Sequence, residues 1–482
     1  MAIEIAQDAN FTTLAIIVFL MQAGFAFLEA GSVRSKNTTN ILFKNFMSSI
    51  CGCVAYWACG HAFAFGGGNA FIGNKHFFLV GVGRHSEELV DWFIYYVYTI
   101  TAATIVSGAM AERTQMRGYF IFTLFCTGWV QPVVTHWAWA EGGWLQSGHY
   151  NEHHNVTIRY EDFAGSSVVH VVGGASALIG AALVGPRKGR FDERGMSIKI
   201  ASSATAMSTL GGFIIVFGFF AFNLLSHGSL SETNDGSVLG LIAVNCILAS
   251  SGGSLTALIY NRYSDKHTHK WSLLSAINGS LVGMVSISAG ASTVYPYGAF
   301  LVGLVAGVVY SLAAKLVERN RVDDPLDAIA VHLGGGTWGI VSVPFLDSDY
   351  GLFYKGNILS MWLIGWNLCG LLVIIIWTLM WAALIFGIMS ALNFLRVTSA
   401  VEKQGLDVVQ HGEKAYPYEM TRRSRSASRA TVDDNCGQTE VQRLTAGSND
   451  TAYATVQEED DTSLKESVSM SQISEADPVS AV

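Results

Sequence analysis

The sequence contains little charge, and it lacks the paired cysteines of a disulfide-rich protein. Only 14% of its 482 residues are Asp, Glu, Lys or Arg, whereas soluble domains carry about 25% charged residues. Hydrophobic residues make up 51%, and the mean hydropathy is +0.36. This composition excludes an ordinary soluble domain and indicates a membrane protein, in which the 50 glycines would let helices approach closely.

The cysteines and the overall charge exclude further classes. Seven cysteines form an odd, scattered set that lies in apolar runs, apart from Cys436. This argues against a disulfide framework and a zinc site, so small packing residues are expected. Much of the net charge of −8 comes from acidic residues near the C-terminus. The net charge therefore says little about partners; we expect no metal, no cofactor and no nucleic-acid partner.

The N-terminus lacks the basic cluster of a cleaved signal peptide. An apolar run from about residue 11 to 31 is long enough to cross a ~30 Å hydrocarbon core. Arg34 and Lys36 follow this run and would hold that side in the cytoplasm. Residues 1–10 would then be extracellular, and Asn10 and Asn155, each in an Asn-x-Thr sequon, are candidate glycosylation sites.

Hydropathy predicts an all-α polytopic membrane protein with eleven spans. The predicted spans cover roughly 11–31, 41–65, 89–110, 118–139, 164–184, 199–226, 238–260, 272–292, 296–317, 328–345 and 357–394. Lys and Arg concentrate in the loops that this count assigns to the cytoplasm, as the positive-inside rule requires. The loops assigned outside hold only Lys75, Arg84, Arg159 and Lys355.

Two segments of the chain echo each other. In each, an aspartate stands eight residues before a histidine that follows valine, and a glycine-rich run comes next: Asp162 with His170, and Asp324 with His332. The histidines lie on the fifth and tenth spans. Because five is an odd number, two consecutive five-span units enter the membrane in opposite orientations. The pattern predicts inverted repeats over 11–184 and 199–345 with a separate eleventh span, a design common in transporters.

The chain changes character after this transmembrane domain of residues 11–396. Residues 397–418 are mixed and would fold against the cytoplasmic face, whereas residues 419–482 are poor in apolar side chains and would be disordered. The basic stretch that starts at Arg422 makes Ser424, Ser426 and Ser428 candidate kinase sites. The alternative is a solvated basic stretch without that role.

His170 and His332 are the main candidates for chemistry inside the membrane. A lone intramembrane histidine more often bonds a neighbouring helix, but a pair related by pseudo-symmetry favours a pathway. A buried neutral imidazole offers one donor and one acceptor, so the pair suits a small polar molecule or a proton relay. A bare cation would lose solvation worth on the order of tens of kcal/mol. Asp162 is either a helix cap or a group that favours a cation at the pore mouth.

Several motifs in this sequence resemble those of the ammonium transporter family (Amt/Mep/Rh), and of its Amt-type members in particular. The resemblance runs from about residue 10 to 418. It rests on the segments Gln22–Gly31, Ser107–Gln115, Asp162–His170 and Asp323–His332. It implies a homotrimer in which each subunit has its own pore, lined at the centre by the twin histidines His170 and His332.

The resemblance also implies roles for residues near the pore mouth. Trp139 matches the aromatic of an external cation site, where cation–π attraction is strongest for Trp. Ser226 matches a hydroxyl that accepts a hydrogen bond there, and Asp162 the acid that supports ammonium recruitment. Phe222 and Tyr98 match two gating rings, although phenylalanine is usual at the position of Tyr98. Without the resemblance, interfacial packing would be the favoured interpretation of these two aromatics.

The resemblance extends into the segment after the last span. Gly405, Asp407, His411 and Gly412 match a cytoplasmic segment that docks on a neighbouring subunit and adjusts activity. Plant members carry a phosphorylated threonine where this chain has Val409. Regulation by a kinase would therefore use the serines further along the chain.

These observations predict a plasma-membrane ammonium transporter. Ammonium would be recruited, lose its proton and pass as ammonia, with proton co-transfer through the histidines; methylammonium would be a second substrate. One alternative is a Rhesus-type ammonia gas channel, against which Trp139 argues because Rhesus members generally carry an aliphatic residue there. Another is an ammonium sensor with minor transport. An enzyme is not expected, since the histidines have no Glu or Cys partner in register. The sequence leaves open whether transport is electrogenic.

Overall fold

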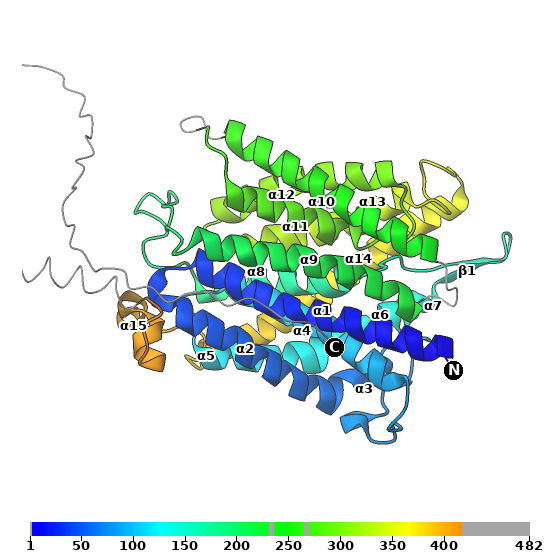
Figure 1. Cartoon of the computed structure of the whole chain (residues 1–482), viewed down its shortest axis with the longest axis horizontal. Helices are drawn as coiled ribbons and strands as arrows, with labels where there is room; N and C mark the ends of the chain where they lie inside the picture. The colour runs from blue at the N-terminus through cyan, green and yellow to red at the C-terminus, as the bar shows by residue number, and fades with distance from the viewer. Residues whose placement is uncertain (1, 231–235, 265–268, 417–482) are drawn as a thin grey trace, which may run out of the picture. The chain divides into compact units, whose positions relative to one another are not determined.

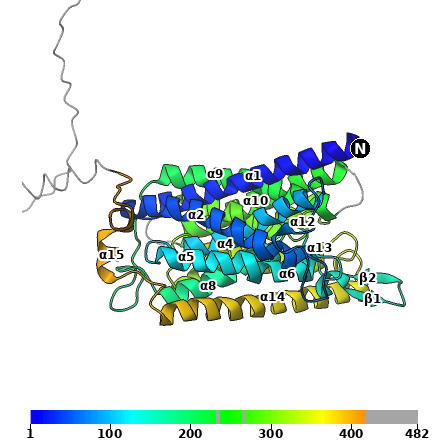
Figure 2. The same ribbon diagram turned by 90° about the horizontal axis from the view of Figure 1, so that it is seen from below.

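The computed structural model describes residues 2–230, 236–264 and 269–416. Long helices run side by side, and two views at right angles agree on their ends (Figures 1 and 2). The N-terminus and the antiparallel strands β1 (His149–Asn151) and β2 (Val156–Ile158) lie at one end, here called the hairpin end. Helix α15 (Ser399–Gln404) lies at the other, the α15 end.

The first repeat contains five membrane-length segments, and three of them include a π-helical turn. Its helices are α1 (Ala2–Ser32), α2 (Thr38–Ala55) with turn η2 (Tyr56–Gly60) and α3 (His61–Phe65), α4 (Glu88–Ala109), α5 (Met116–Phe125) with turn η4 (Cys126–Val130) and α6 (Gln131–Trp139), and turn η5 (Ser166–Val171) with α8 (Val172–Val184). The short elements η1 (Ser35–Asn37), η3 (Phe77–Leu79) and α7 (Trp144–Ser147) lie in its connections.

The second repeat follows the same order. Its helices are α9 (Thr205–Leu230), α10 (Gly236–Ser264), α11 (Leu273–Ile287), α12 (Pro296–Arg319), and turn η6 (Ile329–Gly334) with α13 (Gly335–Leu346). The long helix α14 (Ile358–Ala391) comes next, and α15 and turn η7 (Asp407–His411) close the described chain. The fifth segment of each repeat begins with a π-helical turn, and each of these turns carries a histidine.

The prediction of an all-α polytopic membrane fold is confirmed. Nine helices of the described chain are long and apolar enough to cross a membrane. The other two predicted spans coincide with the continuous segment α2–η2–α3 and with α11, which is shorter, at 15 residues. Residues 2–10, for which an extracellular location is predicted, belong to α1. Ser424, Ser426 and Ser428, with the whole of the predicted disordered tail of residues 419–482, lie outside the described residues.

Two predicted span boundaries were wrong for local reasons. The sixth span begins at Thr205 rather than 199, because the backbone N–H groups of Ser203 and Ala204 bond carbonyls at the end of α1. The eighth span ends at Ile287 rather than 292. The carbonyls of Ser288 and Ala289, just after it, accept hydrogen bonds from Ala164 and Phe163, which precede η5.

Glycines allow the close helix contacts that the composition suggested. A Cβ on Gly253 of α10 would lie 2.2 Å from the carbonyl oxygen of Gly279 on α11. The two histidine segments also meet at glycine: a Cβ on Gly174 would lie 2.3 Å from the nitrogen of Leu333. Larger residues at these places would push the backbones apart, so glycine sets the helix spacing there.

Candidate functional site

His170 and His332 meet in the interior. Their Nδ1 atoms are 3.2 Å apart, the rings are stacked with centroids 5.1 Å apart, and the side chains are 0% and 5% exposed. At this distance one Nδ1 must carry a hydrogen and the other must accept it, since two donors or two acceptors would repel. The pair therefore shares one proton between the two repeats.

An aspartate positions each histidine in the same way. Asp162 Oδ2 accepts hydrogen bonds from the backbone N–H of Ser167 (2.8 Å), five residues on, and of Val168 (3.0 Å). Asp324 Oδ2 accepts from Ile329 N–H, also five residues on, at 2.7 Å. Each carboxylate thus caps the π-helical turn that carries a histidine, which explains why the acid recurs at this spacing.

Burial shifts the pKa of both carboxyls, which precede the membrane-spanning helices. Burial raises the pKa of Asp162, while hydrogen bonds from Ser167 and Val168 oppose the rise. Burial, and then the neighbouring Asp327, raise the pKa of Asp324 to about 7. Asp162 Oδ1 is buried and has no hydrogen-bond partner among the described residues. It remains able to interact with a cation that approaches from the hairpin end.

A column of aromatic rings separates the histidines from the hairpin end. The rings of Tyr98 and Phe222 meet edge to face with centroids 4.5 Å apart, and Phe222 lies 5.6 Å from His170. Both are fully buried, at 1% and 0% exposure. Trp139 follows at 5.6 Å from Tyr98, at the end of α6. Its indole N–H donates to the Asp162 carbonyl at 2.8 Å.

The structure therefore brings together all seven residues that the sequence places at the pore. Ser226 belongs to this group because its hydroxyl lies 2.8 Å from that of Tyr98. Sequence reasoning missed two further rings beside the histidines: Phe219, 5.5 Å from His170, and Phe25, 6.5 Å from His332. The signals were available, since Phe219 precedes Phe222 by three residues on one helix and Phe25 lies in the Gln22–Gly31 motif.

A small cavity of about 30 Å³ continues from His332 toward the α15 end. Its walls are mostly apolar, including Phe25, Leu28 and Leu326, and its polar lining residues are Glu29, Thr104, Asn278 and His332. This volume is enough to hold a water-sized molecule. A hydrated ion does not fit, whereas a molecule the size of ammonia or water does.

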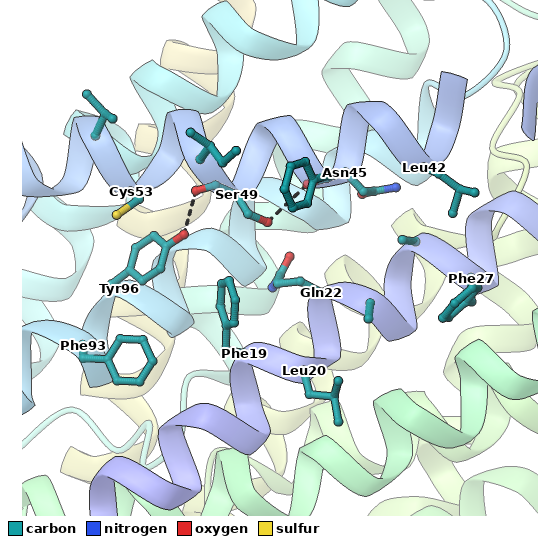
Figure 3. Close-up of a pocket in the computed structure, with 15 residues that line it drawn as sticks. Phe19, Leu20, Gln22, Phe27, Leu42, Asn45, Ser49, Cys53, Phe93 and Tyr96 are labelled. Atoms are coloured by element: carbon teal, nitrogen blue, oxygen red, sulfur yellow. Dashed lines mark hydrogen bonds between the residues drawn. The ribbon is translucent and has the colours of Figure 1, made fainter. Parts of the chain in front are cut away.

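A larger hollow has no part in this pathway. It is a groove of about 610 Å³ on the outer side of α1, α2 and α4 (Figure 3). Its polar side chains bond within the chain: the Tyr96 hydroxyl donates to the Ser49 carbonyl at 2.7 Å, and the Ser49 hydroxyl donates to the Asn45 carbonyl at 3.2 Å. With polar groups paired in this way and apolar walls, the groove offers no site for chemistry.

Buried ion pairs join the loops at the α15 end. Arg187 bonds both Glu112 (2.5 Å) and Asp323 (2.8 Å), and Glu112 also pairs with Arg34. Burial alone would raise the pKa of Asp323, but the hydrogen bonds from Arg187 lower it below its ordinary value. This network ends one residue before Asp324, the cap of the His332 turn.

The segment after α14 packs on this network within the same chain. Asp407 Oδ1 accepts from the backbone N–H of Asn40 at 2.9 Å, at the start of α2, and His411 lies 3.1 Å from the Asn40 amide. Gly405 and Gly412 have φ of +108° and +68°, which glycine adopts without strain. Burial raises the pKa of Asp407, and backbone N–H groups of α2 oppose the rise. The resemblance implies docking on a neighbouring subunit; within the single chain described, Asp407 and His411 contact Asn40 of α2.

The remaining residues singled out from the sequence lie on the surface. Asn10 on α1 and Asn155 beside β2 are both exposed at the hairpin end. Asn155 Oδ1 accepts from the Tyr150 hydroxyl at 2.6 Å. Val409 is 42% exposed. Across residues 2–230, 236–264 and 269–416, no group of three or more His, Cys, Asp or Glu side chains is placed to hold a metal ion.

Comparison with known proteins matches nearly the whole described chain. A family model described as Ammonium Transporter Family matches residues 9–416. A putative ammonium transporter 1 of Caenorhabditis elegans is 42% identical, over 84% of this chain and 78% of that protein. Ammonium transporter 1 member 3 of Solanum lycopersicum is 35% identical, over 83% and 91%.

Solved structures agree with the fold. A solved protein described as Sensor Amt Protein is 31% identical with a TM-score of 0.76, and the match covers 84% of this chain and 98% of that one. The crystal structure of Candida albicans Mep2 has a TM-score of 0.71 at 22% identity, over 82% and 87%. At this lower identity the likeness concerns the fold alone.

Proposed function

Because the chain belongs to the ammonium transporter family, we propose that it recruits ammonium, removes one proton and conducts ammonia past His170 and His332. The observation that carries this proposal is the 3.2 Å contact between two buried histidine nitrogens behind a closed pair of aromatic rings. A site of this kind binds a small neutral molecule, and it excludes an ion because the ion would have to shed its water.

Recruitment takes place at the hairpin end. The face of Trp139 attracts a cation through its ring quadrupole, the Ser226 oxygen accepts an N–H, and the buried carboxylate of Asp162 adds a favourable charge nearby. These groups act on ammonium before it meets Tyr98 and Phe222. Potassium finds the same attraction at the mouth, but it has no proton to give up and so cannot become a neutral molecule.

Ammonia that passes the rings of Tyr98 and Phe222 reaches the two histidines. With the proton shared at Nδ1, His170 Nε2 is buried and has no hydrogen-bond partner within the described parts of the chain. When the shared proton is on His170, Nε2 can accept the proton that ammonium gives up; the shared proton then moves to His332 Nδ1, and His332 releases its Nε2 proton toward the cavity, which leaves the pair in the opposite tautomer. Proton and ammonia then leave by the cavity beside Glu29, and each turnover carries one positive charge.

The topology and assembly follow the same proposal. Basic residues gather in the loops at the α15 end, as expected for a cytoplasmic face, so the hairpin end would be extracellular and the membrane the plasma membrane. Asn10 and Asn155 would then be available for glycosylation. A homotrimer, with one pore in each subunit, remains part of the proposal. A kinase acting on Ser424, Ser426 or Ser428 would reach sites beyond the described residues.

Voltage-clamp recording in cells that express the chain tests the proposed transport. A saturable inward current with ammonium, and a smaller one with methylammonium, is the expected result. Uptake without current would favour the Rhesus-type gas channel. Neither uptake nor current at normal surface abundance would favour the sensor alternative, which is consistent with the similarity to a protein described as Sensor Amt Protein.

Replacing Trp139 tests recruitment. Trp139→Leu removes the cation–π face and is expected to raise the half-saturating ammonium concentration by about ten-fold, since such contacts contribute roughly 0.5–2 kcal/mol. The maximal current should change much less because the histidines are untouched. Trp57→Leu, at an exposed tryptophan, is the matched control. An unchanged half-saturating concentration in Trp139→Leu would move recruitment elsewhere.

Replacing Asp407 tests the proposed regulatory segment. Asp407→Ala removes the acceptor for Asn40 N–H and should release the segment, lowering the maximal current about two- to five-fold. The half-saturating concentration should stay the same, because the segment lies at the opposite end from Trp139. Gln404→Ala, at an exposed position, serves as control. Limited proteolysis would report release; a released segment with full current would refute the regulatory role.

A further inference from the structure

The hydroxyl of Tyr98 makes two hydrogen bonds across the pore. It donates to the carbonyl oxygen of Phe222 at 2.8 Å, and it lies 2.8 Å from the hydroxyl oxygen of Ser226. Tyr98 belongs to α4 in the first repeat, whereas its two partners belong to α9 in the second. The phenol therefore links the two repeats at the level of the closed rings.

The direction of the bond between Tyr98 and Phe222 follows from the number of hydrogens that each group carries. A phenol has a single hydrogen, and the Phe222 carbonyl, which can only accept, takes it. The phenol oxygen and the Ser226 hydroxyl oxygen lie 2.8 Å apart, and either hydroxyl can be the donor in that contact.

These bonds also fix the gate. The phenol is tied to the backbone of the residue that carries the opposing ring, and both residues are fully buried. Rotation of the Tyr98 ring would break both bonds at once. A molecule that needs only a small displacement of Phe222 passes without breaking them, whereas a wider molecule requires Tyr98 to move as well.

From this geometry we infer that Tyr98 is a specificity-determining residue, whose hydroxyl latches the aromatic gate and selects against substrates wider than ammonia. The inference rests on the proposed function and adds to it the basis of size selection. Phenylalanine in this place keeps the ring and the edge-to-face contact but leaves the gate unlatched. Methylamine, the deprotonated form of methylammonium, is the wider substrate that reports the difference.

The test compares maximal currents of methylammonium and ammonium in the full chain. Tyr98→Phe is expected to raise the ratio of methylammonium to ammonium current about five-fold, the factor that two net hydrogen bonds at the weak end of their usual range represent together. Tyr96→Phe is the matched control, since Tyr96 lies on the same helix and its hydroxyl also bonds a buried carbonyl, but its side chain lines the groove (Figure 3). The methylammonium-to-ammonium current ratio of Tyr96→Phe should equal that of the unaltered chain.

Ser226→Ala provides a second measurement. It removes one of the two bonds and keeps the other, so the ratio should rise by a smaller factor, about two-fold. This result stands even if Tyr98→Phe fails to reach the surface, and a ratio of maximal currents does not depend on weakened recruitment. In the double variant Tyr98→Phe with Ser226→Ala, the methylammonium-to-ammonium current ratio should exceed that of Ser226→Ala. The added effect of Tyr98→Phe should be smaller than its effect in the unaltered chain, because the two side chains share one hydrogen bond.

The outcomes separate this inference from the proposed function. No ammonium current in the unaltered chain would refute transport itself. A normal ammonium current with an unchanged ratio in Tyr98→Phe would overturn the latch and leave transport standing. A fall in both currents at normal surface abundance would also overturn it, because the phenol oxygen would then be serving the cation directly.

Discussion

Replacing His170 with glutamate is expected to admit potassium. The unaltered lumen holds two neutral rings in contact, with a cavity of about 30 Å³ beyond them, and gives a bare cation nothing in return for its lost water. A carboxylate changes this balance: a unit charge about 4 Å from a cation contributes about 4 kcal/mol at an effective dielectric constant of 20. The selectivity for ammonium over potassium should fall at least ~100-fold.

Current recordings in ammonium solution and then in potassium solution measure this selectivity. His332→Glu should lower the selectivity in the same way as His170→Glu, because the two rings face each other across the Nδ1 contact. His170→Gln is the control, since it removes the imidazole without adding charge and should reduce ammonium current while potassium stays excluded. If both glutamate variants kept full current and selectivity, the histidines would not line the path.

The sequence was sufficient to predict the repeat architecture because the information is local. Span lengths follow from hydropathy, and the recurrence of an acid eight residues before a histidine identifies the inverted halves. The reason for the spacing needed the structure. A carboxylate that caps amides five residues on requires a π-helical turn, and hydrophobic periodicity does not distinguish such a turn from an ordinary helix.

The residues of the pore could be named from sequence, but their mutual contacts could not. Tyr98 was recognised as unusual, and its bond to Ser226 joins residues 128 positions apart. Likewise, Asp407 meets Asn40 across 367 positions. Pairs this distant depend on how helices cross, which single-sequence patterns do not encode, so the latch and the docked segment became visible only in the folded chain.

A buried ion pair joins the consecutive helices α1 and α2. Lys44 Nζ lies 2.6 Å from Glu29 Oε2, and their side chains are 0% and 1% exposed. Asn45 donates to the same oxygen at 3.2 Å, and the Ser107 hydroxyl bonds the other one. Two intramembrane charges are tolerated only because each compensates the other.

Lys44→Met should therefore destabilise the fold severely. It leaves the Glu29 carboxylate buried without its cation, which costs about 3–5 kcal/mol, so the melting temperature in detergent and the surface abundance should both fall sharply. Lys75→Met, at an exposed lysine, should change neither. The double variant Glu29→Gln with Lys44→Met removes both charges and keeps the approximate volume, and should recover most of the loss. If Lys44→Met alone were as stable as the unaltered chain, the pair would not be holding α1 to α2, and water must reach Glu29 through the cavity that it shares with His332.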